Sequence, residues 1–329
     1  MNRVFLIVGP TATGKSEIAA EIACRLGAEI VSADAFQIYR GLDLLTAKPE
    51  HAMLAKAPHH LIGAVPLSEE MNVEKYRAAA ETVIRDIHAR GKPAIVAGGS
   101  GLYIKALTHG LAKLPAANSE LREELANATT EELFERLRTM DPAGAEQIDR
   151  KNKRRLIRAV EVCLLTGEPF SAQRTEWNVT PPVSGVAAAV SDGGIENVAK
   201  PNLLPPVTAA ATPGVFVYRE RDDLYQRIDR RVEHMFEAGV VEEVRALSSV
   251  GQTAEKTLGL REIQMLLAGE ISQPECIAKI QQATRRYAKR QLTWFRRQSN
   301  LEPLNLSPHG SSAAIDSIAQ SASRVFANG

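Results

Sequence analysis

A short glycine-rich loop near the amino terminus limits the fold more than any other part of the chain. Residues 9–16 read GPTATGKS and satisfy the pattern G-x-x-x-x-G-K-[ST]. The apolar run before the loop, VFLIV at residues 4–8, predicts a buried strand, and apolar residues at helical spacing in residues 15–26 predict a helix after it. In this setting the pattern predicts a phosphate-binding loop, because glycines let backbone N–H groups and a helix N-terminus approach phosphate oxygens.

Short apolar runs and helical stretches alternate over the first hundred residues. A strand is expected around residues 30–32, a helix at residues 73–90, where Gly-Lys-Pro follows, and another strand at residues 94–97. This alternation predicts a parallel sheet covered by helices. We therefore predict an α/β fold, a P-loop NTPase-like parallel sheet flanked by helices, with a helical insertion domain.

Composition and periodicity divide the chain into segments. The expected segments are residues 1–112, the first part of the core; 113–176, a charged helical insertion; 177–213, a flexible loop rich in small residues and proline; 214–306, which complete the core with basic C-terminal helices; and 307–329, a Ser/Ala-rich tail. The core is thus expected to be interrupted by the insertion.

The overall composition indicates where the protein is located but not which reaction, if any, it catalyses. The 329 residues carry a formal net charge of +1, which by itself predicts no polyanionic partner. Three cysteines lie far apart without a CxxC pair, which favours a reduced protein and suggests no zinc site. The apolar run at residues 4–8 is too short for a signal peptide or a membrane span. We expect a cytoplasmic protein that does not contact membranes, and a monomer.

The acid that usually accompanies a phosphate loop is missing from its expected place. ATPases and GTPases carry an aspartate at the end of a second strand to help hold Mg²⁺, whereas the strand at residues 94–97 is followed by Gly98, Gly99 and Ser100. The carboxylate instead appears as Asp34, directly after the strand around residues 30–32. Asp34 is a candidate general base or hydrogen-bond acceptor; the alternative is a helix cap or loop acid.

Two stretches of the chain are strongly basic. RKNKRRLIR at residues 150–158 carries six positive charges in nine positions, and RRYAKRQLTWFRR at residues 285–297 carries six in thirteen without an acid. In the second stretch Arg286 and Arg290 share one helical stripe, and aromatic residues lie on another. Basic residues interleaved with aromatics favour an RNA backbone with unstacked bases, although either stretch alone is compatible with a solvated helix face.

Five blocks of the sequence together resemble the bacterial tRNA dimethylallyltransferases. They are GPTATGKS (9–16), SADAFQIYRGLDLLTAKP (32–49), AGGSGLYIKAL (97–107), RRLIRAVEV (154–162) and TRRYAKRQLTWFR (284–296). The family transfers a dimethylallyl group from dimethylallyl diphosphate to the exocyclic amine of the adenine 3′ of the anticodon. The resemblance therefore implies this activity, Mg²⁺ as a cofactor, and the anticodon stem-loop of tRNA and dimethylallyl diphosphate as partners.

On the donor side, the resemblance assigns roles to the phosphate loop and to four catalytic positions. The loop residues that would hold the diphosphate are Gly9, Pro10, Thr11, Ala12, Thr13, Gly14, Lys15 and Ser16, with the metal at Ser16. The expected catalytic residues are Asp34 as the base, Thr11, Ser100 and Arg221, the last meeting the diphosphate. No attack on a γ-phosphate is needed when the diphosphate leaves from carbon, so the missing acid is dispensable.

On the RNA side, the resemblance and the basic stretches assign a larger set of contacts. The residues expected to contact tRNA are Asp34, Ala35, Phe36, Gln37, Ser100, Arg122, Arg154, Arg155, Leu156, Ile157, Arg158, Arg286 and Arg290. Within this set Asp34 and Gln37 would read the target adenine. The chain departs from the family pattern at Ala35, where serine is more frequent, at Ser100, where threonine is frequent, and at Leu260, where tyrosine is usual.

Three other functions remain open from the sequence. A small-molecule P-loop kinase explains the phosphate loop but not the basic stretches or the missing acid. A prenyltransferase that acts on free adenine nucleotides shares the diphosphate site and Asp34 but needs no extensive RNA surface. An RNA-binding protein without activity leaves Asp34 and Arg221 without a task.

Overall fold

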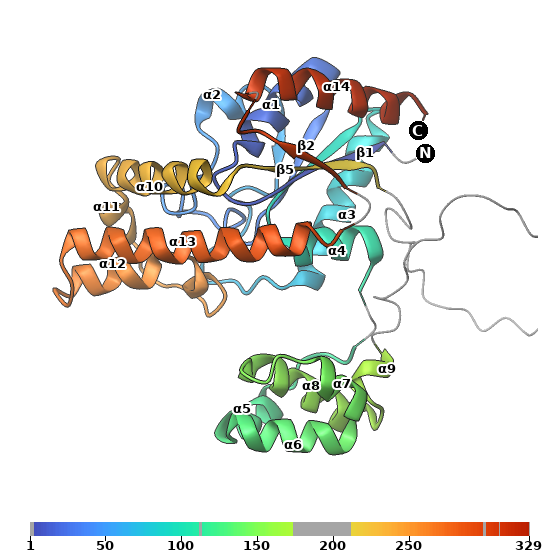
Figure 1. The fold of residues 1–329 in the computed structure, drawn as a ribbon, viewed down its shortest axis with the longest axis vertical. Coiled ribbons are helices and arrows are strands. Elements are labelled where there is room, and N and C mark those ends of the chain that lie inside the picture. Colours follow the sequence, from blue (N-terminus) through green and yellow to red (C-terminus); the bar gives the residue numbers. More distant parts are fainter. Residues whose placement is uncertain (1–2, 112–113, 174–211, 299–300, 309, 329) are drawn as a thin grey trace, which may run out of the picture. The chain divides into compact units, whose positions relative to one another are not determined.

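The protein consists of two compact units, shown in the computed structural model of Figure 1. The structure describes residues 3–111, 114–173, 212–298, 301–308 and 310–328. One unit comprises Met1–Thr108 and Ala199–Gly329, and the other comprises His109–Val198. The loop expected at residues 177–213 lies outside the described residues except for its last two positions.

The first unit contains a six-stranded sheet whose strands are all parallel. The strands are β1 (Val4–Val8), β2 (Glu29–Ala33), β3 (His59–His60), β4 (Ala94–Gly98), β5 (Gly214–Tyr218) and β6 (Glu302–Asn305), in the order β3-β2-β4-β1-β5-β6. The predicted parallel sheet is confirmed. The two edge strands were not predicted, because β3 has only two residues and β6 contains Pro303, which weakens its strand pattern.

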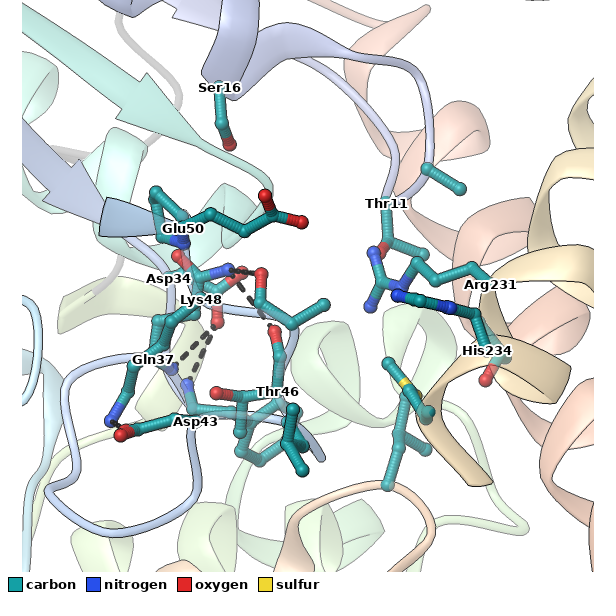
Figure 2. Close-up of a pocket in the computed structure, with 18 of the residues that line it drawn as sticks. Thr11, Ser16, Asp34, Gln37, Asp43, Thr46, Lys48, Glu50, Arg231 and His234 are labelled. Atoms are coloured by element: carbon teal, nitrogen blue, oxygen red, sulfur yellow. Dashed lines mark hydrogen bonds and ion pairs between the residues drawn. The ribbon is translucent and has the colours of Figure 1, made fainter. Parts of the chain in front are cut away.

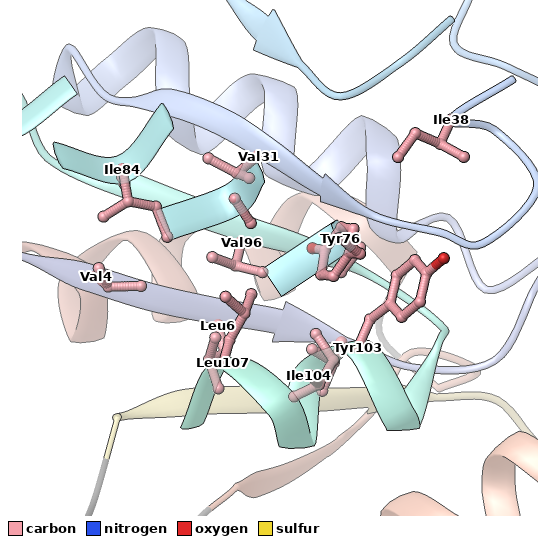
Figure 3. Close-up of a cluster of buried hydrophobic side chains, with 14 of the residues drawn as sticks. Val4, Leu6, Val31, Ile38, Tyr76, Ile84, Val96, Tyr103, Ile104 and Leu107 are labelled. Carbon is pink, nitrogen blue, oxygen red and sulfur yellow. The ribbon is translucent and has the colours of Figure 1, made fainter. Parts of the chain in front are cut away.

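Helices cover both faces of the sheet, and alternate strand residues point to each face. One apolar cluster holds Leu6, Val31 and Val96 from the strands together with residues of α3 (Val73–Ala89) and α4 (Gly101–His109). Figure 3 shows this cluster, with Tyr76 of α3 and Ile104 and Leu107 of α4 beside the strand residues. The pairing of β4 with β1 and β2 aligns the carboxyl ends of the three strands at Val8, Ala33 and Gly98, where the loops of the site begin.

The opposite face of the sheet is covered by α1 (Lys15–Leu26) and α14 (Gly310–Asn328). The segment expected as a tail at residues 307–329 therefore contains a helix that completes the core. Ile315, Ile318 and Ala322 of α14 are buried at helical spacing. The many serines and alanines around them mask this stripe in the sequence.

Four further helices extend the first unit beside the carboxyl edge of the sheet. They are α10 (Arg221–Glu237), α11 (Val240–Arg245), α12 (Leu260–Leu267) and α13 (Gln273–Phe295), and the short α2 (His51–Leu54) precedes β3. A separate apolar cluster joins Met235, Ile263 and Ile280 from these helices to Leu45 in the loop after β2. This cluster fixes α10 and α13 close to the loops of the site. No helix in the described part of the chain is long and apolar enough to cross a membrane.

The second unit is entirely helical where it is described. It contains α5 (Ser119–Asn127), α6 (Thr130–Met140), α7 (Pro142–Gln147), α8 (Lys153–Thr166) and α9 (Phe170–Gln173). Its core includes Leu125, Leu133 and Leu137, packed against Leu156 and Val160 of α8. A capping box at Thr129 and Glu132 begins α6.

Candidate active site at the carboxyl edge of the sheet

A cavity of about 580 Å³ lies where the loops after β1 and β2 meet α10 and α13. Its lining includes Thr11, Ala12, Gly14, Lys15 and Ser16 from the phosphate loop; Asp34, Phe36 and Gln37 from the loop after β2; Leu44, Ala47 and Glu50 further along it; and Arg227, Arg230, Arg231, His234 and Met235 from α10. Figure 2 shows Asp34, Gln37 and Glu50 on one side and Thr11, Arg231 and His234 on the other. Ligands of parallel sheets bind at this edge.

The phosphate loop has the wrapped backbone that its sequence predicts. Gly9 has no room for a side chain, since a Cβ there would lie 2.1 Å from the carbonyl oxygen of Val217. Gly14 is the N-cap of α1 and adopts a left-handed conformation with φ 94°. The positive end of α1 therefore points toward the loop interior, where it favours an anion.

Three arginines outside the phosphate loop donate hydrogen bonds to residues of the loop. Arg219, which is 7% exposed, donates from Nε to the carbonyl oxygen of Thr13 at 2.9 Å. On α10, Arg227 Nε donates to the Ala12 carbonyl oxygen at 3.0 Å, and Arg231 Nη1 donates to Thr11 Oγ1 at 2.9 Å. Arg227 and Arg231 are one helical turn apart and line the cavity, so they add positive charge beside the loop.

Arg221, which the resemblance places at the diphosphate, is not among the residues that line this cavity. It begins α10, is exposed, and has its guanidinium 5.3 Å from the ring centroid of Tyr225. Arg231 lies ten positions after Arg221 in the helix, about 15 Å along the axis. The structure thus places Arg227 and Arg231 of this helix, and not Arg221, at the phosphate loop. The repeated arginines of RDDLYQRIDRR at helical spacing are the signal in the sequence.

Lys15 lies in the cavity with its ammonium group 3.2 Å from the carbonyl oxygen of Pro10. Burial lowers the pKa of Lys15 to about 8; the charge of Asp34 opposes this shift and that of Arg231 adds to it. Only the charged ammonium form of Lys15 attracts an anion. The protein loses this form as the pH rises through about 8.

We expect the affinity for an anionic diphosphate to fall above this pH. Between pH 7 and pH 9 the dissociation constant for inorganic diphosphate should rise about tenfold, because most of the Lys15 charge disappears over this interval. Isothermal titration at several pH values measures this dependence. Because diphosphate itself loses protons over this range, the quantity compared is the ratio of the dissociation constants of the wild type and Lys15→Met. Lys15→Met should bind more weakly, and a ratio that does not change with pH would contradict this assignment.

Asp34 both orders its own loop and presents an oxygen to the cavity. Its Oδ1 accepts hydrogen bonds from the backbone N–H groups of Phe36 at 2.9 Å and Gln37 at 3.2 Å. One oxygen of Asp34 thus has the loop-ordering role that the sequence left as an alternative to a general base. Among the described residues no hydrogen bond involves Oδ2, so this oxygen remains available to a ligand in the cavity that Asp34 lines.

Gln37 has a fixed orientation and a single remaining polar atom. Its Nε2 donates to the carbonyl oxygens of Thr46 at 3.2 Å and Ala47 at 2.9 Å. Two carbonyl acceptors require the nitrogen on that side, which leaves Oε1 as an acceptor for a ligand. The loop that Gln37 contacts is held from outside by Glu243, which accepts from the N–H groups of Leu44 and Leu45 at 2.8 and 2.9 Å.

Ser100 supports the site from behind the cavity wall. It is buried, its Oγ accepts from the N–H of Ala35 at 2.9 Å, and its side chain hydrogen-bonds the hydroxyl of Tyr287. Neither Ser100 nor Ala35 lines the cavity. Tyr287 does, and its ring centroid lies 6.2 Å from that of Phe36; burial raises the pKa of Tyr287. Two aromatic rings therefore flank the cavity near Asp34. The sequence shows Tyr287 only as part of an aromatic stripe on a helix and does not indicate that it lies near Phe36.

The RNA-contacting residues expected in the second unit have different environments. Arg154 and Arg155 are exposed, Ile157 is partly buried, and Leu156 is fully buried in the helical core, so Leu156 has no surface for a direct RNA contact. On α13 of the first unit Arg286 and Arg290 are exposed, and Arg290 lies over the ring of Tyr287 at 5.6 Å.

Arg122 and Arg158 are engaged by a buried acid, Glu161. Arg122 donates from Nε and Nη2 to the two Glu161 oxygens at 3.0 Å each, and Arg158 donates at 2.7 Å. Glu161 is 0% exposed and also accepts from the N–H of Asn118 at 2.8 Å. Burial opposes ionisation, but the bonds from Arg122 and Arg158 outweigh it and lower the pKa of Glu161. Both arginines thus have a structural task in the second unit.

Glu161→Gln should destabilise the second unit by about 1–3 kcal/mol, because it weakens hydrogen bonds to charged groups in a buried setting. The lowered pKa means that the contribution of Glu161 is present above the pKa of the unfolded chain and is lost as the pH falls through the folded-state pKa. Urea unfolding at pH 7 and pH 4 measures both effects. Glu135→Gln, in an exposed pair with Arg138, is the control and should change stability by less than about 0.5 kcal/mol.

The fold and the cavity define a P-loop protein whose phosphate loop faces an aspartate at the carboxyl edge of a parallel sheet. A family model for the IPP transferases matches residues 37–298. A tRNA dimethylallyltransferase of Akkermansia muciniphila is 40% identical over 311 residues, 94% of this chain and 96% of the relative. The tRNA dimethylallyltransferase 1 of Citrifermentans bemidjiense is 42% identical over 303 residues, 91% of this chain and 90% of the relative.

A solved structure gives the same result at the level of the fold. The full-length tRNA isopentenylpyrophosphate transferase of Bacillus halodurans has a TM-score of 0.66 and 30% identity, and the match covers 100% of this chain and 98% of that protein. The chain therefore belongs to the IPP transferase family. The resemblance noted in the sequence is confirmed, and the protein is a transferase.

Proposed function

We propose that this protein transfers a dimethylallyl group from dimethylallyl diphosphate to the exocyclic amine of the adenine 3′ of the anticodon in tRNA, and releases diphosphate. The observation that carries the proposal is the placement of Asp34 in one cavity with a phosphate loop whose neighbouring strand β4 ends in glycine. An acceptor for a proton and a cradle for a diphosphate thus line the same space. Relatives named tRNA dimethylallyltransferase over almost the full chain support the acceptor class.

The charge distribution of the cavity suits a leaving diphosphate. Lys15, Arg227 and Arg231 lie on the side of the phosphate loop, whereas Leu44, Ala47 and Met235 provide apolar surface in the same cavity. We propose that the phosphate loop and its cations hold the diphosphate and that the apolar residues contact the five-carbon chain. As the C–O bond breaks, negative charge grows on the diphosphate, and prepositioned cations and amides stabilise it.

The acceptor amine requires a group that removes a proton. The adenine nitrogen attacks the allylic carbon, its new N–C bond replaces the C–O bond, and the diphosphate leaves with the electron pair. The nitrogen then carries an extra proton, which we assign to Oδ2 of Asp34, the oxygen not used by the loop. Oε1 of Gln37 is a second acceptor on this side, so the pair suits a group with two N–H donors.

A magnesium ion is part of the proposal, and the oxygen donors of the cavity fit it. The Ser16 hydroxyl and the Glu50 carboxylate both line the cavity, and Figure 2 shows them on the same side of it. Mg²⁺ prefers oxygen ligands, and it is typically held by few protein groups together with substrate phosphates. Ser16 would hold the ion, which when bound neutralises charge on the leaving diphosphate. In the described part of the chain no cluster of three or more His, Cys, Asp or Glu residues is placed to hold a metal without phosphate.

The tRNA surface would include the exposed face of α13. Arg286 and Arg290 lie on this face, and Tyr287 on the same helix lines the cavity with Phe36. The target adenine must leave its stack to reach Asp34, and aromatic rings can accept an extruded base. Because tRNA is an intracellular substrate, we propose a cytoplasmic location, and we propose that the protein acts as a monomer.

A transfer assay distinguishes this function from its rivals. The purified protein is incubated with Mg²⁺ and radiolabelled dimethylallyl diphosphate, together with either total tRNA or AMP. We expect label in tRNA and none in AMP. Label in AMP alone would establish a nucleotide prenyltransferase, and ATP turnover without prenyl transfer would establish a kinase.

A further inference from the structure

A buried glutamine of α13 joins two loops of the site. Gln291 is 6% exposed and does not line the cavity. Its Nε2 donates to the carbonyl oxygen of Gly99 at 2.8 Å, and its Oε1 accepts from the backbone N–H of Thr11 at 2.9 Å. One side chain thus connects the phosphate loop after β1 to the turn after β4.

The space around this side chain admits little change. A Cβ on Gly99 would lie 2.4 Å from Nε2 of Gln291 and 3.0 Å from the carbonyl oxygen of Gly9. A donor on one side and an acceptor on the other also fix which way the amide faces. Glycine at position 99 therefore leaves room for the Gln291 side chain, which a larger residue would displace.

The consequence for the phosphate loop falls on Thr11. Its N–H is occupied by Gln291, so this amide does not face a phosphate. Its Oγ1 accepts from Arg231 Nη1 at 2.9 Å, and an arginine can only donate. The hydroxyl proton of Thr11 must then point away from Arg231. Because Thr11 lines the cavity, this proton is available to an anion bound there.

We propose that Gln291 is a positioning residue for the donor: it fixes the backbone of Thr11 so that the Thr11 hydroxyl donates to the leaving diphosphate. The inference rests on the proposed function for the identity of the donor. Its direct consequence, binding of a diphosphate through Thr11, does not require that any prenyl group be transferred.

A double-mutant cycle on binding of inorganic diphosphate tests this coupling. Gln291→Met keeps the length of the side chain and removes the hydrogen bonds to Thr11 and Gly99, together with the side-chain bond to Tyr287. Thr11→Val removes the hydroxyl. Each single variant should weaken binding about tenfold, and the double variant should be no weaker than Thr11→Val, since both remove the same contact. Gln281→Met is the matched control on α13, where Gln281 donates to Asp229 and Glu233 of α10 through long bonds of 3.4 Å; it should bind as the wild type does.

Rescue by a neutral acid provides a readout that a merely structural role would not change. In Gln291→Glu a protonated carboxyl can donate to Gly99 and accept from Thr11, whereas the ionised form cannot donate. The ratio of variant to wild-type diphosphate affinity should therefore rise as the pH falls from 8 to 6, by about tenfold or more.

Four results would overturn the proposal: additive losses in the cycle, wild-type binding by Gln291→Met, a pH-independent ratio for Gln291→Glu, or no binding of diphosphate by the wild type. A wild-type protein that binds diphosphate through this coupling but transfers no prenyl group would instead refute the proposed function and leave the role of Gln291 intact.

Discussion

Asp34→Asn should lower kcat for prenyl transfer to tRNA by about 10²–10⁴-fold, the range expected for loss of a general base. The substitution is nearly isosteric, and its oxygen can still accept from the N–H groups of Phe36 and Gln37 as Oδ1 does. What it removes is the second oxygen as a proton acceptor. The loop should keep its shape, so the KM for tRNA and the melting temperature should stay close to those of the wild type.

Comparison with Asp34→Ala separates the two tasks of this residue. Alanine removes the base and also the acceptor that orders the loop, so it should add a loss of stability of about 1 kcal/mol to the same loss of kcat. Single-turnover transfer assays and thermal unfolding of both variants provide the comparison. If Asp34→Asn retained activity within about tenfold of the wild type, Asp34 would be a loop residue and the base would lie elsewhere.

Arg231→Met should lower kcat/KM for the prenyl donor by about 10²–10³-fold, as expected when one donor to a developing anion is lost. Arg231 contacts Thr11 of the phosphate loop, lines the cavity and has a pKa that burial lowers and the nearby charge of Asp34 raises. Its charge is therefore held in a poorly hydrated place beside the expected diphosphate. Steady-state kinetics at varied donor concentration measures the loss.

Arg221→Met is the matched control for Arg231→Met, because both arginines lie on α10 and only Arg231 lines the cavity. The control should change kcat/KM for the donor by less than about threefold. Comparable losses in the two variants would show that the donor extends to the start of α10, as the resemblance implies, and would contradict the assignment of Arg231, rather than Arg221, to the diphosphate site.

The fold was predictable where the sequence pattern is local. The phosphate loop, β1 and α1 follow from VFLIVGPTATGKS, and β4 from a short apolar run before Gly98. β6 and α14 were not predictable in this way. β6 gains its strand character from pairing with β5, and the apolar stripe of α14 becomes clear only against α1. Long-range packing, and not local propensity, decides such elements.

Within the site, it was easier to predict which residues take part than which other residues they contact. Asp34 and Lys15 stood out because a phosphate loop and a strand end limit where such groups can lie. The contacts of Ser100, Arg122 and Leu156 depend on segments distant in the sequence, namely Ala35, Glu161 and the helical core. The same applies to Gln291, whose importance is invisible until α13 lies beside Gly99 and Thr11.

The most direct test of the proposed reaction is mass spectrometry of tRNA treated with the purified protein, dimethylallyl diphosphate and Mg²⁺. Nuclease digestion then locates any added mass. We predict that the adenine 3′ of the anticodon gains one dimethylallyl group, that Asp34→Asn abolishes this gain, and that ATP added in place of the prenyl donor is not consumed. Unmodified tRNA together with hydrolysis of ATP would show that the phosphate loop serves a nucleotide and would contradict the central claim.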